Sequence, residues 1–238
     1  MHSYYQKNRL KFKKNLINLI KPVSLEIEKI TGSRFSVIIE EIWNFYEKNM
    51  LENFLYIGGD SVSGTSNMCG ACCFIAMGEV LKKYNTPVEE SGHLMTLAYE
   101  RKYKKIPSFL KSLLKKVFTS PKLLKKMYMK KDRKNEENCR LNPGSYLTET
   151  QDPPEKGFDF SYHNLVCPIS DFAVKHGYEE YMPYICNLDY VMFGVLGAPL
   201  YREHTCFEDG DYCDFKLKNG APVMDYWPPV FTQGKGYK

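Results

Sequence analysis

The stretch CPISDFAVKHGYEEYMPYICNLDYVMFGVLGAPLYREHTCFEDGDYCDF, residues 167–215, gives the clearest local signals in the chain. Apolar spacing predicts two helices over 169–177 and 179–197, and Gly177 is suited to cap the first of them. The chain then becomes extended, with a strand over 199–206, a tight turn at 208–211 and a hairpin partner over 212–218. This stretch therefore predicts two helices followed by a two-stranded hairpin.

Two further strands precede these helices, and a helical region precedes the strands. Residues 146–150 and 157–166 alternate with period two, as half-buried strands do. Helical periodicity and breaker residues predict the remaining elements, over 3–20, 35–56, 69–84, 88–104 and 107–117, and a basic helix from Pro121. The fold class expected is α+β: an N-terminal helical region (1–135) packed on a C-terminal antiparallel sheet (136–238) with two inserted helices, in ββααββ order, forming one continuous globular unit.

The chain is long enough to form a substantial hydrophobic core without disulfide bonds. It has 238 residues and eight cysteines, and no apolar run approaches the ~20 residues of a membrane span. The N-terminus lacks the apolar region and cleavage site of a secretory signal. We therefore expect a cytoplasmic protein without a membrane span, whose cysteines are reduced; a homo-oligomer remains open.

The positive charge of the chain is concentrated in one segment. Residues 101–134 contain 14 lysines and arginines against one acid, Asp132. Such a segment can bind phosphates or anionic lipid, but it can equally be a solvated helical face over an apolar stripe. The second interpretation is preferred, and no nucleic-acid partner is expected. The stripe that this face would bury is Leu110, Leu113, Leu114, Val117, Leu123, Leu124, Met127 and Met129.

A thiol and a carboxylate share one face of the predicted helix 179–197. Cys186 and Asp189 are three residues apart, which places them on the same side of a helix. A cysteine becomes nucleophilic when a nearby cation lowers its pKa, and Arg202 on the following strand is a candidate cation. The alternative is a small buried thiol and a structural Asp189–Arg202 ion pair; the spacing does not separate the two.

The residue types in the predicted hairpin suggest an alternative kind of site, one that binds zinc. Glu203, Cys206 and Cys213 are zinc ligands by chemistry, but Glu203 and Cys206 fall on opposite faces of a regular strand. Upstream, Cys69 and Cys72 form a CxxC pair, which has no preceding strand of the kind that redox motifs follow. We therefore expect helix-packing cysteines there and no metal in the hairpin.

The C-terminal motifs together resemble the L-2-amino-thiazoline-4-carboxylic acid hydrolase family. The residues that carry the resemblance are Cys167-Pro168, Cys186 to Asp189, Arg202 to Thr205, and Gly210 to Phe215. The match is good over 157–218 and weaker over 70–130. The same C-terminal part is also similar to vinyl-reductase-type ligand-binding domains, some of which hold zinc.

The resemblance implies a small-molecule hydrolase that opens a cyclic amidine-like ring, as the family's namesake opens a 2-aminothiazoline to N-carbamoyl-L-cysteine. The expected catalytic residues are Cys186, Asp189 and Cys213, with Asp189 holding the protonated amidine. Arg202, with its bidentate fork, is expected to bind the substrate carboxylate, together with Cys167 and Thr205. No cofactor is expected. The alternative to a hydrolase is a non-catalytic module that binds a small molecule or zinc.

Overall fold

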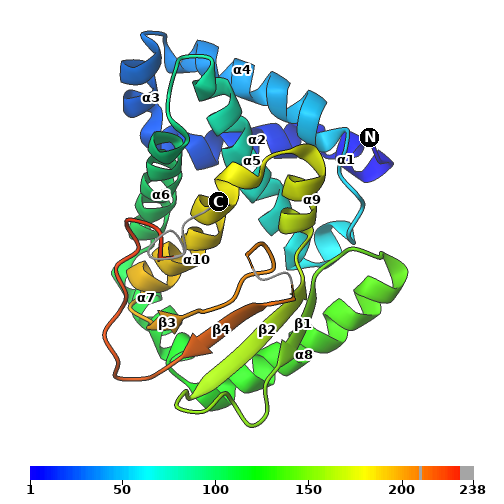
Figure 1. Cartoon of the computed structure of the whole chain (residues 1–238), viewed down its shortest axis with the longest axis vertical. Coiled ribbons are helices and arrows are strands. Elements are labelled where there is room, and N and C mark those ends of the chain that lie inside the picture. Colours follow the sequence, from blue (N-terminus) through cyan, green and yellow to red (C-terminus); the bar gives the residue numbers. More distant parts are fainter. Residues whose placement is uncertain (209–210, 231–238) are drawn as a thin grey trace.

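The computed structural model describes residues 1–208 and 211–230 and has the predicted α+β architecture. Helices occupy the N-terminal part and a four-stranded sheet the C-terminal part, and the order of the last six elements is ββααββ as predicted (Figure 1). The helices are α1 (Ser3–Lys7), α2 (Arg9–Ile20), α3 (Ser24–Thr31), α4 (Phe35–Tyr46), α5 (Ser63–Lys82), α6 (Val88–Lys104), α7 (Ser108–Phe118), α8 (Pro121–Leu141), α9 (Pro168–His176) and α10 (Met182–Leu196). The strands are β1 (Leu147–Thr150), β2 (Phe160–Val166), β3 (Leu200–Tyr201) and β4 (Cys213–Leu217).

The sheet is antiparallel throughout and has the order β1-β2-β4-β3. In the central pair, Tyr162 lies opposite Phe215, and Asn164 lies opposite Cys213. Because side chains alternate along a strand, these four residues share one face of the sheet. The other face carries polar residues, including Lys216. The sheet therefore presents two chemically different surfaces.

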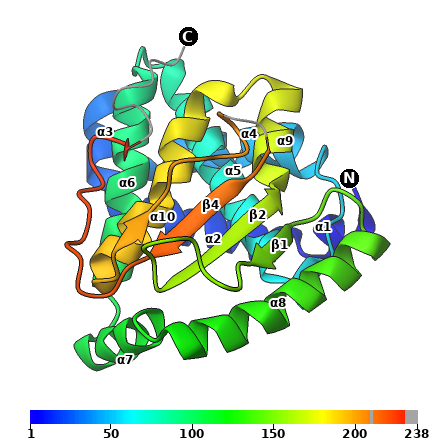
Figure 2. The ribbon, with the colours of Figure 1, turned by 60° about the horizontal axis from the view of Figure 1, so that its bottom comes forward.

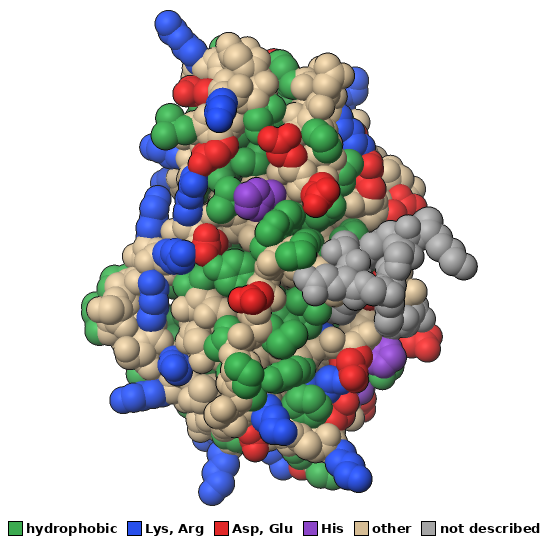
Figure 3. Space-filling model, turned by 60° about the vertical axis from the view of Figure 1, so that its left-hand side comes forward, with side chains coloured by type: hydrophobic (Ala, Val, Ile, Leu, Met, Phe, Trp, Pro, Cys, Tyr) green, Lys and Arg blue, Asp and Glu red, His purple; other side chains and the backbone are tan. Residues whose placement is uncertain are grey.

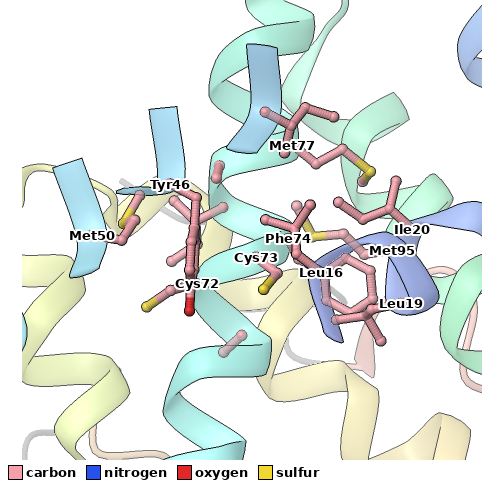
Figure 4. Packing of buried hydrophobic residues seen from close by; sticks show 14 of the residues in the cluster. Leu16, Leu19, Ile20, Tyr46, Met50, Cys72, Cys73, Phe74, Met77 and Met95 are labelled. Atoms are coloured by element: carbon pink, nitrogen blue, oxygen red, sulfur yellow. The ribbon is translucent and has the colours of Figure 1, made fainter. Parts of the chain in front are cut away.

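One hydrophobic cluster joins the N-terminal helices to the inserted pair. It contains residues from Tyr5 to Val191, and its centre lies around α5, where Cys72, Phe74 and Met77 pack among side chains of α2, α4 and α6 (Figure 4). Cys69, Cys72 and Cys73 are all buried there, so the prediction of helix-packing cysteines is confirmed. The boundary predicted at 135/136 falls within α8.

Helix α8 runs along the open edge of the sheet, beside β1 (Figure 2). It ends at Leu141, so it continues beyond residue 135, where the helical region was expected to end. The polar residues of this segment make long-range hydrogen bonds: Asn135 Nδ2 donates to Thr148 Oγ1 at 2.9 Å, and Asn138 Nδ2 donates to Ile57 O at 2.9 Å. Tertiary contacts thus stabilise a helix that its local composition disfavours.

Helix α5 also differs from its predicted start, because it begins at Ser63 and not at residue 69. Gly64 lies directly against the ring of Tyr146, where an added Cβ would come within 2.4 Å of the ring. Thr65 is buried as well. Close packing of these small residues on another part of the chain explains why the helix extends into a Gly- and Ser-rich segment.

The predicted strand 199–206 is wrong beyond Tyr201, where β3 ends. The Asp214 carboxylate accepts hydrogen bonds from the backbone N–H groups of Glu203 and His204, at distances of 2.8–3.0 Å. The Asp214 side chain therefore accepts hydrogen bonds from backbone N–H groups that, in a regular strand, would donate to carbonyl groups of the neighbouring strand. The alternation expected over 202–206 is lost with the strand. Part of the expected tight turn, Asp209 and Gly210, lies outside the described residues.

The apolar stripe expected beneath the basic segment is largely exposed. Helix α7 contains no buried residue, and of the eight stripe residues only Leu124 is buried. Figure 3 views the side that carries α6 and α7 and shows hydrophobic side chains gathered between charged ones. Burial of the stripe was therefore a wrong expectation. None of the described helices has the length and hydropathy needed to cross a membrane.

Candidate functional site

A cavity of about 1050 Å³ lies between the apolar face of the sheet and helices α2, α5, α6, α8 and α10. Five of the residues singled out in the sequence line it together: Cys167, Cys186, Asp189, Arg202 and Cys213. They come from the N-terminal boundary of α9, from α10, from the end of β3 and from β4. The inserted helices and the hairpin thus place residues from four separate motifs around one cavity.

Arg202 borders this cavity, and its side chain is held by contacts within the protein. Its side chain is 1 % exposed. Its Nε donates to Asp214 O at 3.0 Å, and its Nη1 donates to Cys186 O at 3.1 Å and to the Asp189 carboxylate at 2.9 Å. The guanidinium carbon also lies 4.1 Å from the centroid of the Phe215 ring. These contacts fix the position of the Arg202 charge.

Asp189 is a carboxylate on α10 that faces the cavity. Its Oδ2 pairs with Arg202, yet its side chain is 38 % exposed, because one side of it faces the cavity. Burial raises the pKa of Asp189 to about 6, against the opposing effect of Arg202. At neutral pH the group is therefore ionised, and it can accept hydrogen bonds from a cationic ligand.

Three thiols converge beside this carboxylate. The Sγ atoms of Cys206 and Cys213 are 3.4 Å apart, and the backbone N–H of Cys206 donates to Cys213 Sγ at 3.2 Å. Hydrogen bonds from Cys167 and Cys206, together with the Arg202 charge, lower the pKa of Cys213. The pKa values of Cys167 and Cys206 rise, mainly because of the hydrogen bonds that each shares with Cys213 and because of burial. Among these three thiols, Cys213 is therefore the one whose ionisation the surroundings favour.

Cys186 has the opposite character. Burial raises the pKa of its thiol well above the usual range, and the Arg202 charge offsets this only in part. Arg202 binds the backbone carbonyl of Cys186 rather than its sulfur. Cys186 and Asp189 do share one face of α10, but the cavity thiol with a lowered pKa is Cys213 on β4.

Two other predicted residues lie away from the cavity lining. Thr205 is buried, and its Oγ1 accepts a hydrogen bond from the Glu208 N–H at 3.0 Å, within a turn. Glu203 pairs with Lys216 on the polar face of the sheet, where Lys216 also contacts Asp214 at 2.8 Å. Glu203 therefore does not join Cys206 and Cys213, and the alternative zinc set does not converge. Within 1–208 and 211–230, no group of three or more His, Cys, Asp or Glu side chains has a metal-binding arrangement.

The cavity is also lined by polar side chains that the sequence interpretation missed. Asn164 lines it from β2, and its Oδ1 is buried without a hydrogen-bond partner among the described residues. Lys131 lines it from α8, with its Nζ 4.9 Å from the centroid of the Tyr128 ring and 5.7 Å from that of Tyr162. The excess of lysine over 101–134 marked the segment, but only the tertiary fold distinguishes Lys131 from its exposed neighbours.

Comparison with known proteins gives one match. The family model described as L-2-amino-thiazoline-4-carboxylic acid hydrolase matches residues 71–217, which is more than half of the chain. No curated protein and no solved structure matches the sequence. The matched range begins within α5, one of the helices that line the cavity, and ends with β4, which carries Cys213. The chain therefore belongs to the L-2-amino-thiazoline-4-carboxylic acid hydrolase family.

Proposed function

We propose that the protein is a hydrolase that opens a small cyclic amidine of the thiazoline type at the carbon bonded to nitrogen and sulfur. The observation that carries this proposal is the placement of the Cys213 thiolate and the Asp189 carboxylate on the wall of the same cavity. A protonated amidine needs an anion to hold it, and its central carbon needs a nucleophile. The cavity supplies both groups.

Asp189 is the group that holds the amidinium. Its pKa of about 6 leaves it ionised at neutral pH, and its side chain is exposed to the cavity. A charge-assisted hydrogen bond from the amidinium N–H keeps the positive charge on the ring, so the ring carbon stays electrophilic. Arg202, bound to Oδ2, fixes the orientation of the carboxylate.

Cys213 is the nucleophile in this proposal. Its thiolate forms a bond to the ring carbon, the bond from that carbon to the ring sulfur breaks, and the released sulfur takes a proton to become a thiol. The intermediate is an isothiourea on Cys213 that retains every atom of the substrate. Water then attacks the same carbon and displaces the Cys213 thiolate, which leaves a urea. The net change is the addition of one water.

Arg202 takes a positioning role here instead of the carboxylate-binding role predicted from the sequence. A bidentate fork to a ligand needs two neighbouring N–H groups, and Nε and Nη1 are already bonded within the protein. The side chain is also almost fully buried. These contacts support a task in orienting Asp189 and in stabilising the Cys213 thiolate.

The test is product formation from 2-amino-thiazoline-4-carboxylic acid. Purified protein should yield N-carbamoylcysteine, detected by liquid chromatography and mass spectrometry, with one oxygen from ¹⁸O-labelled water. Asp189→Asn should lose most of this activity, while Asp171→Asn, an exposed acid on α9, should keep it. Absence of product from the wild-type protein, or full turnover by Asp189→Asn, would contradict the proposal.

A further inference from the structure

Lys131 belongs to the basic segment, and its side chain lines the cavity from α8. It lines the cavity between Tyr128 and Tyr162. Within the described ranges, no hydrogen bond or ion pair to its ammonium is present; the neighbouring Asp132 carboxylate instead bonds Thr148 and Thr150. An ammonium placed among aromatic rings without a carboxylate has unused capacity to bind an anion.

The charges around the cavity have opposite signs on different walls. Asp189 on α10 is negative and accessible, and Lys131 on α8 is positive. Burial lowers the pKa of Lys131, while the negative charges of Asp132 and Asp189 act to raise it. A ligand with one cationic and one anionic group therefore meets a complementary charge at each end.

The approach to Lys131 is also positive. A smaller hollow of about 310 Å³ lies between α8 and residues 61–63, and Lys131 lines both this hollow and the main cavity. Lys130 and Lys134 line the hollow and are exposed to solvent. Clustered charge of one sign in a concave surface raises the local concentration of oppositely charged ligands. The basic residues of this hollow thus favour the approach of anions to Lys131.

We propose that Lys131 binds the carboxylate of the substrate, so that the cavity selects zwitterionic amidine carboxylic acids over amidines that lack the acid group. This inference rests on the proposed function for the reacting end of the substrate, where Asp189 holds the amidinium. It assigns to α8 the role that the sequence suggested for Arg202. It also gives part of the basic segment a function in recognition.

The experiment compares two substrates and three variants. The substrates are 2-amino-thiazoline-4-carboxylic acid and 2-aminothiazoline, which lacks the carboxylate. Lys131→Met should lower kcat/KM for the acid by about 10- to 100-fold, the range expected for a lost charged hydrogen bond, chiefly through KM. The same variant should change kcat/KM for 2-aminothiazoline by less than about threefold, because that substrate makes no such bond.

Lys102→Met is the matched control, because Lys102 also lines the cavity and lies over tyrosine rings, 5.4 Å from the centroid of Tyr99. It should leave the preference between the two substrates unchanged. Lys131→Arg should retain the preference for the acid over 2-aminothiazoline, because it keeps the positive charge. If Lys131→Met does not fold, this variant still tests the inference. Equal losses on both substrates with Lys131→Met, or no loss on either, would overturn the inference and leave Lys131 a packing residue.

Calorimetry separates this inference from the proposed function. If the wild-type protein hydrolyses neither compound, the proposed function has failed, and the binding of the two compounds still tests Lys131. Tighter binding of the acid, lost in Lys131→Met and kept in Lys102→Met, would support the carboxylate subsite alone. Equal binding of both compounds by the wild-type protein would refute it.

Discussion

Replacing Arg202 by methionine should destabilise the fold strongly, because this side chain carries a buried charge with three partners. The substitution removes the donors to the carbonyls of Asp214 and Cys186 and leaves the Asp189 carboxylate without its cation. Loss of one partner from a buried ion pair typically costs about 3–5 kcal/mol. Water in the cavity can hydrate Asp189, which is 38 % exposed, so we expect the lower half of that range.

The reciprocal substitution, Asp189→Asn, should cost less, about 1–2 kcal/mol. The asparagine oxygen still accepts from Arg202, and Arg202 keeps both of its carbonyl partners. Arg101→Met is a matched control: Arg101 pairs with Glu26 near the surface, with side chains 39 % and 32 % exposed, and such a pair is worth about 0–1 kcal/mol. Because these costs differ by mechanism, their order is more informative than any single value.

The assay is urea unfolding followed by circular dichroism, with the free energy of unfolding obtained by linear extrapolation. The expected order of destabilisation is Arg202→Met, then Asp189→Asn, then Arg101→Met. If Arg202→Met lowered the free energy of unfolding no more than Arg101→Met does, the claim that a buried network orients Asp189 would be contradicted. A larger cost for Asp189→Asn than for Arg202→Met would contradict the exposure of Asp189 to the cavity.

Three further results follow from the structure. Because the pKa of Asp189 is raised to about 6, kcat/KM should fall as the pH drops below 6, which a pH-rate profile tests. The same raised pKa means that the contribution of Asp189 to stability should be present below about pH 4 and lost as the pH rises through 6. Unfolding measured over this pH range tests the second trend. Gly64→Ala should cost about 1–3 kcal/mol in thermal unfolding, since its Cβ would come within 2.4 Å of a tyrosine ring, whereas Gly70→Ala, with no atom within 4 Å, should be neutral or stabilising. Iodoacetamide at pH 6 should alkylate Cys213 faster than Cys186, as peptide mapping would show, because only the Cys213 pKa is lowered; the reverse order would refute the thiolate assignment.

The elements that the sequence predicts well are those with a strong period and clear end signals. The helix over 88–104 and the helix before Gly177 follow their expected bounds, and β2 lies within the alternating stretch 157–166. Where the prediction is wrong, a distant side chain is responsible. Asp214 takes the donors of the expected strand after Tyr201, and Asn135 extends a helix through contacts with β1. Neither contact leaves a local signal in the sequence.

The candidate site, like the fold, was predicted only as far as local sequence signals allow. The motifs identify Cys167, Asp189, Arg202 and Cys213 as residues worth placing together, and these residues do line one cavity. Sequence spacing does not reveal which thiol is ionised, because the pKa of Cys213 depends on two other cysteines that only the fold brings near. Lys131 is one of many lysines in its segment, so its access to the cavity also depends on how α8 packs.

The central claim is that Cys213, and not Cys186, attacks the substrate. The direct test is the turnover of 2-amino-thiazoline-4-carboxylic acid by Cys213→Ala and Cys186→Ala, each checked for a native circular dichroism spectrum. We predict that Cys213→Ala lowers kcat on the order of a thousandfold or more, as loss of a nucleophile does, while Cys186→Ala stays within about tenfold of the wild type. Full turnover by a folded Cys213→Ala variant would contradict the account.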